Sequence, residues 1–162
     1  MDQSRLADDF INRVVESYAD TLLRVSFAYL KNRSDAEDVV QEVYLKLMQR
    51  RPLFKNQDHE KAWLIRVAVN LCKNRLKTAW FRKTIPLEES IPTATPGESR
   101  VMEAVFTLPP QERAIVQLFY FEGYMIKEIA AIIGRKESTT GSLLYRARHK
   151  LKTILKEEFD HD

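Results

Sequence analysis

Three consecutive segments decide the fold of the C-terminal part of this chain: Met125-Ile-Lys-Glu-Ile-Ala-Ala-Ile-Ile-Gly134, Arg135-Lys-Glu-Ser-Thr-Thr140 and Gly141-Ser-Leu-Leu-Tyr-Arg-Ala-Arg-His-Lys-Leu-Lys152. A short apolar helix, a turn marked by glycine and a basic second helix are typical of a helix-turn-helix, whose second helix enters the DNA major groove. Ser138 or Thr139 is the expected N-cap of that second helix. The alternative is an ordinary solvated helix with a basic face.

The distribution of charge supports an anionic partner more strongly than its total. The 162 residues carry a net charge of only +3, with a pI near 9.0. Residues 61–83, however, contain seven bases and no acid, and residues 135–156 contain seven bases and one acid. Such segregated charge indicates separate surfaces for separate partners.

Upstream of the helix-turn-helix, the apolar periodicity predicts a bundle of three long helices. Four glycines in the whole chain argue against a turn-rich β fold. The first helix is expected to include Phe10 and to end near Leu30, and the second is expected to open with a capping box formed by Ser34 and Glu37 and to end before Pro52. The third is expected to start at an N-cap, Asp58, and to run to about Trp80. Three long helices with short links form a compact bundle.

A change of composition separates this bundle from the helix-turn-helix. Residues 86–99 contain three prolines, one glycine and three glutamates, a composition typical of a linker. Beyond it, we expect a short helix over 101–106, a restart at Pro110, and a helix over 111–120 that Gly123 ends. The fold class is therefore all-α, with two small helical domains (1–84 and 101–162) joined by a flexible linker (85–100).

The third helix has a polar face suited to single-stranded nucleic acid. Five side chains recur every three or four residues and share that face: Arg66, Asn70, Lys73, Asn74 and Lys77. Asparagine amides can read an unpaired base edge, while cations can hold phosphates. Phe54 and Trp63 are candidates to stack on an extruded base. For Trp63 the alternative is a place in the core.

The second helix carries an acidic stripe. Asp38, Gln41 and Glu42 stand at positions i, i+3 and i+4 on one face. They form either a docking surface for a basic protein or a helix start favoured by its dipole. For Asp35 and Glu37 we prefer the dipole interpretation, whereas composition leaves Asp38 and Glu42 undecided.

Signals of catalysis are missing from the sequence. There is no phosphate-binding glycine loop, and one cysteine with three scattered histidines makes no metal set, so we expect no cofactor, no metal and no enzyme activity. Cys72 falls on an apolar helix face and is expected to be inert packing. A single cysteine fits a reducing cytoplasm, and no uncharged apolar run reaches membrane-spanning length. We therefore expect a soluble, cytoplasmic protein.

Four motifs in order resemble one family. They are Asp35-Ala-Glu-Asp-Val-Val-Gln-Glu42, Trp63-Leu-Ile-Arg-Val-Ala-Val-Asn70, Leu108-Pro-Pro-Gln-Glu-Arg113, and Glu128-Ile-Ala-Ala131 with Tyr145-Arg-Ala-Arg148. Together they resemble an extracytoplasmic-function (ECF) sigma factor of bacterial RNA polymerase, over nearly the whole chain. The resemblance implies that region 2 binds the β′ clamp helices of core polymerase and melts the −10 promoter element. It implies that region 4 binds the β flap and the −35 element, and that an anti-sigma factor is a further partner.

The resemblance also assigns residues to roles. It places polymerase docking on Asp38, Gln41 and Glu42, and capture of the −10 strand on the loop and helix that carry Phe54, Trp63, Arg66, Asn70 and Asn74, with Lys73 and Lys77 on the same face. It places −35 contacts on Ser142, Arg146 and Arg148. Many members of the family carry bases at the positions of Gly141 and Leu143, so contacts here are expected either to shift toward Lys136, Thr139 and Thr140 or to be weaker and less selective.

Other functional classes have distinct signatures. A helix-turn-helix repressor or activator would bind duplex DNA tightly without polymerase, usually as a dimer on a palindrome. A nucleic-acid-modifying enzyme would require a metal or nucleophile set. A helical adaptor would bind only protein. The sequence favours a promoter-specificity subunit over all three.

Overall fold

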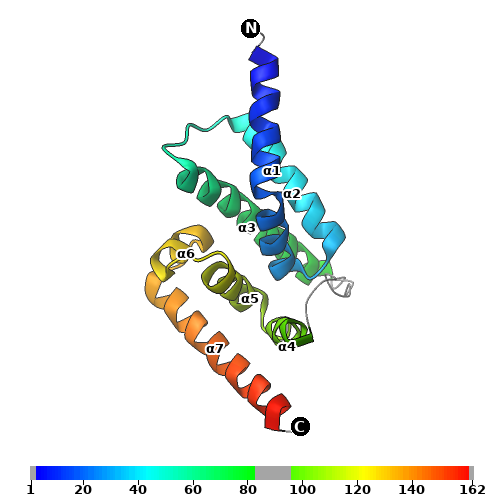
Figure 1. Cartoon of the computed structure of the whole chain (residues 1–162), viewed down its shortest axis with the longest axis vertical. Coiled ribbons are helices and arrows are strands. Elements are labelled where there is room, and N and C mark those ends of the chain that lie inside the picture. The colour runs from blue at the N-terminus through cyan, green and yellow to red at the C-terminus, as the bar shows by residue number, and fades with distance from the viewer. Residues whose placement is uncertain (1–2, 83–95, 161–162) are drawn as a thin grey trace.

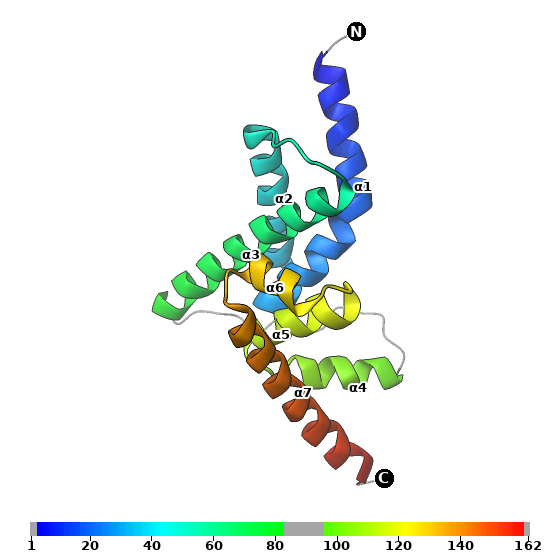
Figure 2. The ribbon, with the colours of Figure 1, turned by 90° about the vertical axis from the view of Figure 1, so that its left-hand side faces the viewer.

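The computed structural model describes residues 3–82 and 96–160, and within these ranges every regular element is helical (Figure 1). This confirms the all-α prediction. Three helices form an N-terminal unit, residues 3–82, and the remaining helices form a C-terminal unit, residues 96–160. The start of the first helix and the end of the last helix lie at opposite ends of the described structure (Figures 1 and 2).

The N-terminal unit is a bundle of α1 (Gln3–Leu30), α2 (Arg33–Arg50) and α3 (Gln57–Arg82). The three helices pack on one another through buried aliphatic side chains, which include Leu22, Val39, Val43, Leu64 and Ala68. Cys72 is fully buried among them, and burial raises the pKa of its thiol to about 12. The predicted three-helix bundle is therefore confirmed, and Cys72 is placed as packing.

Both helix starts in this bundle lie earlier than the sequence predicted. The N-cap of α2 is Asn32, whose side-chain oxygen accepts from the Asp35 amide at 3.0 Å, and not Ser34. Asn56 holds the same position before α3, where its side chain accepts from the His59 amide at 2.8 Å. Asp58, the predicted cap, lies within the first turn of α3. In both places an asparagine two residues upstream satisfies the free amide.

The C-terminal unit begins with α4 (Pro96–Val105), followed by α5 (Pro110–Val116) and the π-helical turn η1 (Gln117–Phe121). The expected helix over 101–106 thus starts at Pro96, because proline has the backbone angle of a first helical turn. The last five residues of the expected linker are helical, and residues 85–95 of it lie outside the described residues. Pro110 opens α5 as predicted.

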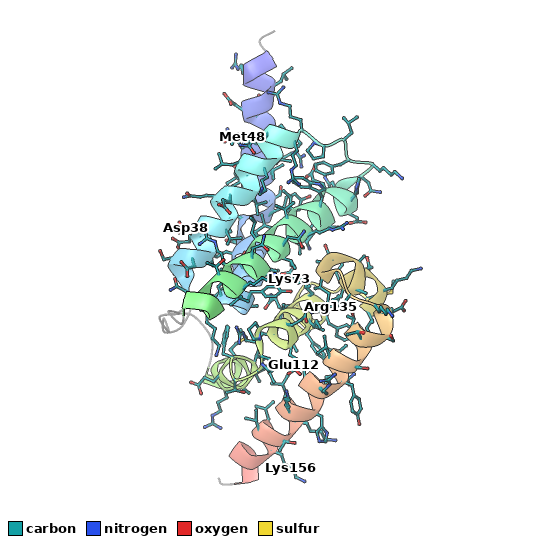
Figure 3. The ribbon with its side chains drawn as sticks, turned by 180° about the vertical axis from the view of Figure 1, so that it is seen from behind. Asp38, Met48, Lys73, Glu112, Arg135 and Lys156 are labelled. Carbon is teal, nitrogen blue, oxygen red and sulfur yellow. The ribbon has the colours of Figure 1, made fainter. Side chains whose placement is uncertain are left out.

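The helix-turn-helix is formed by α6 (Ile126–Ile133) and α7 (Glu137–Asp160), which pack on each other. Gly134 ends α6 with φ of 71°, a left-handed conformation that glycine adopts without strain. Because α7 begins at Glu137, the expected caps Ser138 and Thr139 lie inside its first turn. A salt bridge of 3.0 Å between Glu112 and Lys150 ties α5 to α7; Glu112 is labelled in Figure 3, on the α5 ribbon beside α7.

The two units pack against each other and share one core. Buried residues of α5, η1 and α6, among them Ile115, Leu118 and Ile129, belong to the same cluster as the core of the bundle. α5 and η1 lie on α1, while α6 lies on α3 (Figure 2). The sequence left the mutual arrangement of the two units open. This arrangement determines which parts of the candidate surfaces are exposed.

Candidate nucleic-acid and polymerase interfaces

The polar face of α3 is largely exposed. Arg66, Asn70, Asn74 and Lys77 all point to solvent. Lys73 differs, because it is half-buried at the junction between the units and its amine donates to the main-chain carbonyl of Ile133. Burial, and secondarily the charge of Arg135, lower the pKa of the Lys73 amine. The structure therefore brings four of the five predicted residues together and places the fifth against the C-terminal unit.

Two aromatic side chains flank the beginning of this face. The rings of Phe54 and Trp63 meet edge to face, with centroids 5.8 Å apart, and Phe54 also meets His59 at 5.5 Å. The Lys55 amide donates to Nδ1 of His59 at 3.1 Å, which fixes the loop before α3. Phe54 and Trp63 pack partly against the core and remain partly exposed. The pair thus combines packing with an accessible aromatic surface.

The acidic stripe lies on α2, beside the distal part of the polar face. Asp38 and Gln41 are exposed and Glu42 is half-buried. Glu42 and Asn74 line one shallow groove of about 360 Å³ between α2 and α3. Asp35 lines the same groove and pairs with Arg75 at 3.8 Å, so its carboxylate bridges two helices besides favouring the start of α2.

The predicted residues of α7 fall on different sides of the helix. Lys136, Ser142 and Arg146 are exposed, and Thr139 is half-buried. Arg148 lines a groove on the flank of α7 that Ser142 and Arg146 do not line, as expected because residues two apart do not share a helix face.

Thr140 requires a correction to the expected DNA contacts. Its side chain is fully buried, and its hydroxyl donates to the Lys136 carbonyl at 2.9 Å. It stabilises the first turn of α7 and is not presented to a ligand in this structure.

The sequence did not predict the groove beside α7. It measures about 740 Å³ and has an apolar floor with a basic rim, formed by Val101, Val105, Val116, Tyr120, Phe121, Tyr145, Arg148, His149, Leu151 and Lys152. The rings of Tyr145 and His149 stack on the rim with centroids 6.4 Å apart. Tyr120, Phe121 and Tyr145 are at least half exposed. The available signal in the sequence was a set of exposed aromatic residues, Tyr120 and Phe121 at the end of η1 and Tyr145 within α7. These residues line a groove only because α4 covers one side of it.

Two searches of the described residues gave negative results. No group of three or more His, Cys, Asp and Glu side chains within residues 3–82 and 96–160 is placed to hold a metal ion. Over the same part of the chain, no helix is both long and apolar enough to cross a membrane.

Comparison with known proteins places these surfaces in a family. The model of sigma-70 region 2 matches residues 14–82, and that of sigma-70 region 4 matches residues 99–151. The two matches fall on the N-terminal and C-terminal units in that order. The chain belongs to the sigma-70 family of RNA polymerase sigma factors, in the extracytoplasmic-function class.

Three relatives illustrate the extent of the similarity. The chain is 27% identical to the ECF RNA polymerase sigma factor BldN of Streptomyces coelicolor, over 93% of this chain and 62% of that protein. It is 32% identical to ECF RNA polymerase sigma factor SigM of Mycobacterium tuberculosis, over 77% of this chain and 66% of SigM. It is 27% identical to RNA polymerase sigma factor SigV of Bacillus subtilis, over 89% of this chain and 90% of SigV. The chain thus spans somewhat under two thirds of BldN and SigM, and most of SigV.

Solved structures share the fold. The sigma factor RpoE of Bartonella quintana, crystallised with the anti-sigma factor NepR, superposes with a TM-score of 0.77 and 22% identity, covering 91% of this chain and 97% of RpoE. CnrH, solved with the cytosolic domain of CnrY, superposes with a TM-score of 0.64 and is 21% identical, and the match covers 91% of this chain and 88% of CnrH. At this identity the likeness establishes the fold alone.

Proposed function

We propose that this protein is a promoter-specificity subunit that directs core RNA polymerase to its promoters and is not itself an enzyme. The observation that carries the proposal is the occurrence of both sigma regions, in order, on one chain whose region 2 presents the acid-free polar face of α3. As a polymerase subunit it acts in the cytoplasm. Region 2 is assigned to residues 1–84 and region 4 to 101–162.

The face of α3 captures the −10 element as single strand. Asn70 reads an extruded base, with Arg66, Asn74 and Lys77 beside it for phosphates and neighbouring bases. Phe54 and Trp63 provide the aromatic wall. Extruding a base costs a few kcal/mol in lost pairing and stacking, which polymerase contacts offset, so the free chain binds promoter DNA weakly.

The start of α7 contacts the duplex −35 element. The proposed contacts are Lys136, directly before the helix, and Thr139, Ser142 and Arg146 on its first three turns, because three of them are exposed and Thr139 is partly exposed. Gly141 and Leu143 contribute no charge there, which predicts few phosphate contacts and a shallow salt dependence. Arg148 is assigned to the groove on the flank of α7 and not to base edges.

Core polymerase occupies two further surfaces. The stripe of Asp38, Gln41 and Glu42 docks on the β′ clamp helices through its negative charge. The apolar groove between α4 and α7 receives the β flap, since an exposed apolar groove with a polar rim is typical of a protein interface. An anti-sigma factor that covers these surfaces is a further proposed partner, as the related RpoE was crystallised with one.

Transcription in vitro from a promoter library tests the proposal. Core polymerase with this protein is expected to start RNA synthesis from a subset of promoters that share two short elements, and core polymerase alone is not. Equal start sites with and without the protein would refute the proposal. Tight and specific duplex binding by the free protein in a gel shift would favour a repressor or activator instead.

A further inference from the structure

We propose that His59 is a positioning residue for the −10 strand. Its side chain fixes the loop of residues 51–56, here called the capture loop, so that the ring of Phe54 is held in place before DNA arrives. This inference rests on the proposed role of Phe54 and α3 in strand capture. It goes beyond that role, because it gives a function to a side chain that the role leaves out.

The capture loop has little packing of its own. Leu53 is 94% exposed, and Arg51, Lys55 and Asn56 are exposed as well, so only Pro52 and Phe54 are partly buried. Ordering such a loop when a ligand binds costs conformational entropy and lowers affinity, unless other bonds have ordered the loop beforehand. The bonds that the loop makes in the free protein therefore bear on how well it holds a base.

His59, in the first turn of α3, supplies such a bond. Its Nδ1 accepts from the Lys55 amide at 3.1 Å, and its own amide donates to the side-chain oxygen of Asn56 at 2.8 Å. The loop and the helix thus exchange hydrogen bonds, as in a capping box, with an imidazole in place of the usual carboxylate. Because Nδ1 accepts, the ring proton must lie on Nε2.

The same imidazole touches the ring that is assigned to the extruded base. The rings of His59 and Phe54 meet edge to face, with centroids 5.5 Å apart and planes at 86°, and Phe54 also meets Trp63 at 5.8 Å. Lys55, whose amide His59 binds, directly follows Phe54 in the chain. One side chain therefore fixes both the backbone beside Phe54 and the orientation of its ring.

Both ends of the capture loop are anchored to the bundle. Directly after His59, the buried carboxylate of Glu60 pairs with both terminal nitrogens of Arg13 of α1, each at 3.0 Å. At the other end, Arg51 ends α2 in the left-handed conformation, with φ of 46°, and its amide donates to the Leu47 carbonyl at 3.0 Å. His59 thus stands on a rigid turn from which it can hold the loop.

The first test separates the hydrogen bond from the ring. His59→Leu removes the acceptor, whereas His59→Asn keeps one, because the side-chain oxygen of asparagine lies as many bonds from the backbone as Nδ1. With core polymerase at a promoter that library transcription selects, His59→Leu is expected to lower permanganate reactivity of the melted strand about fivefold, because apparent affinity scales with the ordered fraction of the loop. His59→Asn is expected to stay within about twofold of wild type, because the bond to the loop is kept.

Gln57→Leu is the matched control, because it places the same apolar side chain at an exposed position of the same helical turn. It is expected to leave melting unchanged. An equal loss in His59→Leu and His59→Asn, or in His59→Leu and Gln57→Leu, would overturn the positioning role. Thermal melts and co-purification with core polymerase check that every variant folds and docks.

The second test is a double-mutant cycle with Phe54→Ala. If His59 acts through this ring, adding His59→Leu to Phe54→Ala is expected to cost less than about twofold more, because interacting residues are not additive. Losses that multiply in full would show that His59 serves only the start of α3, and would overturn the inference. Wild-type activity of His59→Leu beside a defective Phe54→Ala would overturn it too and leave the proposed function standing. A wild-type holoenzyme without promoter selectivity would refute the proposed function, and this inference with it.

Discussion

At the scale of single residues, neighbouring positions on one helix lie in different environments. Asn70 and Lys73 share a face of α3, yet Asn70 is exposed while the Lys73 amine is bonded across the junction. On α7, Arg146 is exposed but does not line the groove that Arg148 lines. Residue type alone predicts a contact with DNA for all four, and orientation separates them.

Asn70 is expected to matter for melting and not for assembly. Asn70→Ala removes the amide that we propose reads a captured base, so open-complex formation is expected to fall by about tenfold, within the 1–3 kcal/mol of a base contact. Permanganate reactivity of the melted strand measures it. Asn12→Ala on exposed α1 is the matched control. Unchanged permanganate footprints for Asn70→Ala would remove base capture from this residue.

Reversal of the acidic stripe tests polymerase docking. The double variant Asp38→Lys, Glu42→Lys is expected to weaken binding to core polymerase by about tenfold or more, since like charges at an interface repel. Co-purification and a titration of labelled protein with core polymerase measure the loss. The double variant Asp9→Lys, Glu16→Lys reverses two exposed acids of α1 and makes the same change in net charge, so it serves as the control. If both variants bind alike, the acids serve only the start of α2.

At the scale of elements, helix ends and turns were the least predictable features. At the starts of α2 and α3, an asparagine two residues upstream of the expected cap accepts from a first-turn amide, Asn32 in α2 and Asn56 in α3. Capping depends on the backbone angle just before the helix, and several residues in a row can accept the same bond. The helices themselves, which depend on long apolar periodicity, were predicted well.

The true cap of α3 can be distinguished from the expected one. Asn56→Ala is expected to destabilise the protein by about 1 kcal/mol, because it removes the bond to the His59 amide. Asp58→Ala removes only a favourable charge in the first turn, worth about 0.5 kcal/mol. Urea unfolding measures both. A larger loss from Asp58→Ala would restore it as the cap.

Gly141 weakens the helix assigned to the −35 element. It lies inside α7 at ordinary helical angles, and a Cβ added there meets no atom within 4 Å. Gly141→Ala is therefore expected to raise stability by about 0.5–1 kcal/mol. Gly134→Ala is the matched control and is expected to destabilise, because Gly134 has φ of +71°. Thermal unfolding that shows no gain for Gly141→Ala would mean that this turn of α7 is not helical in solution.

At the scale of the whole molecule, the shared core makes the two regions one folding unit. Ile115 and Leu118 of region 4 are buried in the same cluster as the bundle, and Arg113 caps α1. Two packed regions of this kind are expected to unfold together.

Removing the Arg113 guanidinium, which bonds the carbonyls of Ala28 and Tyr29 across the junction, is expected to uncouple the two regions. Arg113→Met leaves three buried carbonyls without their donor, so the single calorimetric transition of the wild type is expected to split, with region 4 melting first. Arg13→Met breaks an ion pair with Glu60 that lies within region 2 and serves as the control, expected to keep one transition. One transition in both variants would show that apolar burial alone couples the regions.

The sequence by itself determined the helical class, the bundle, the helix-turn-helix and the polar face of α3, because apolar and polar periodicity record which side of a helix is buried. Only the tertiary structure decided that Lys73 and Arg113 lie at a junction, that Thr140 is interior and that α4 and α7 form a groove. These features join residues from separate helices, up to 85 positions apart in the case of Arg113 and Ala28. Local periodicity fixes a side chain's direction on its own helix, but what it meets there depends on long-range packing.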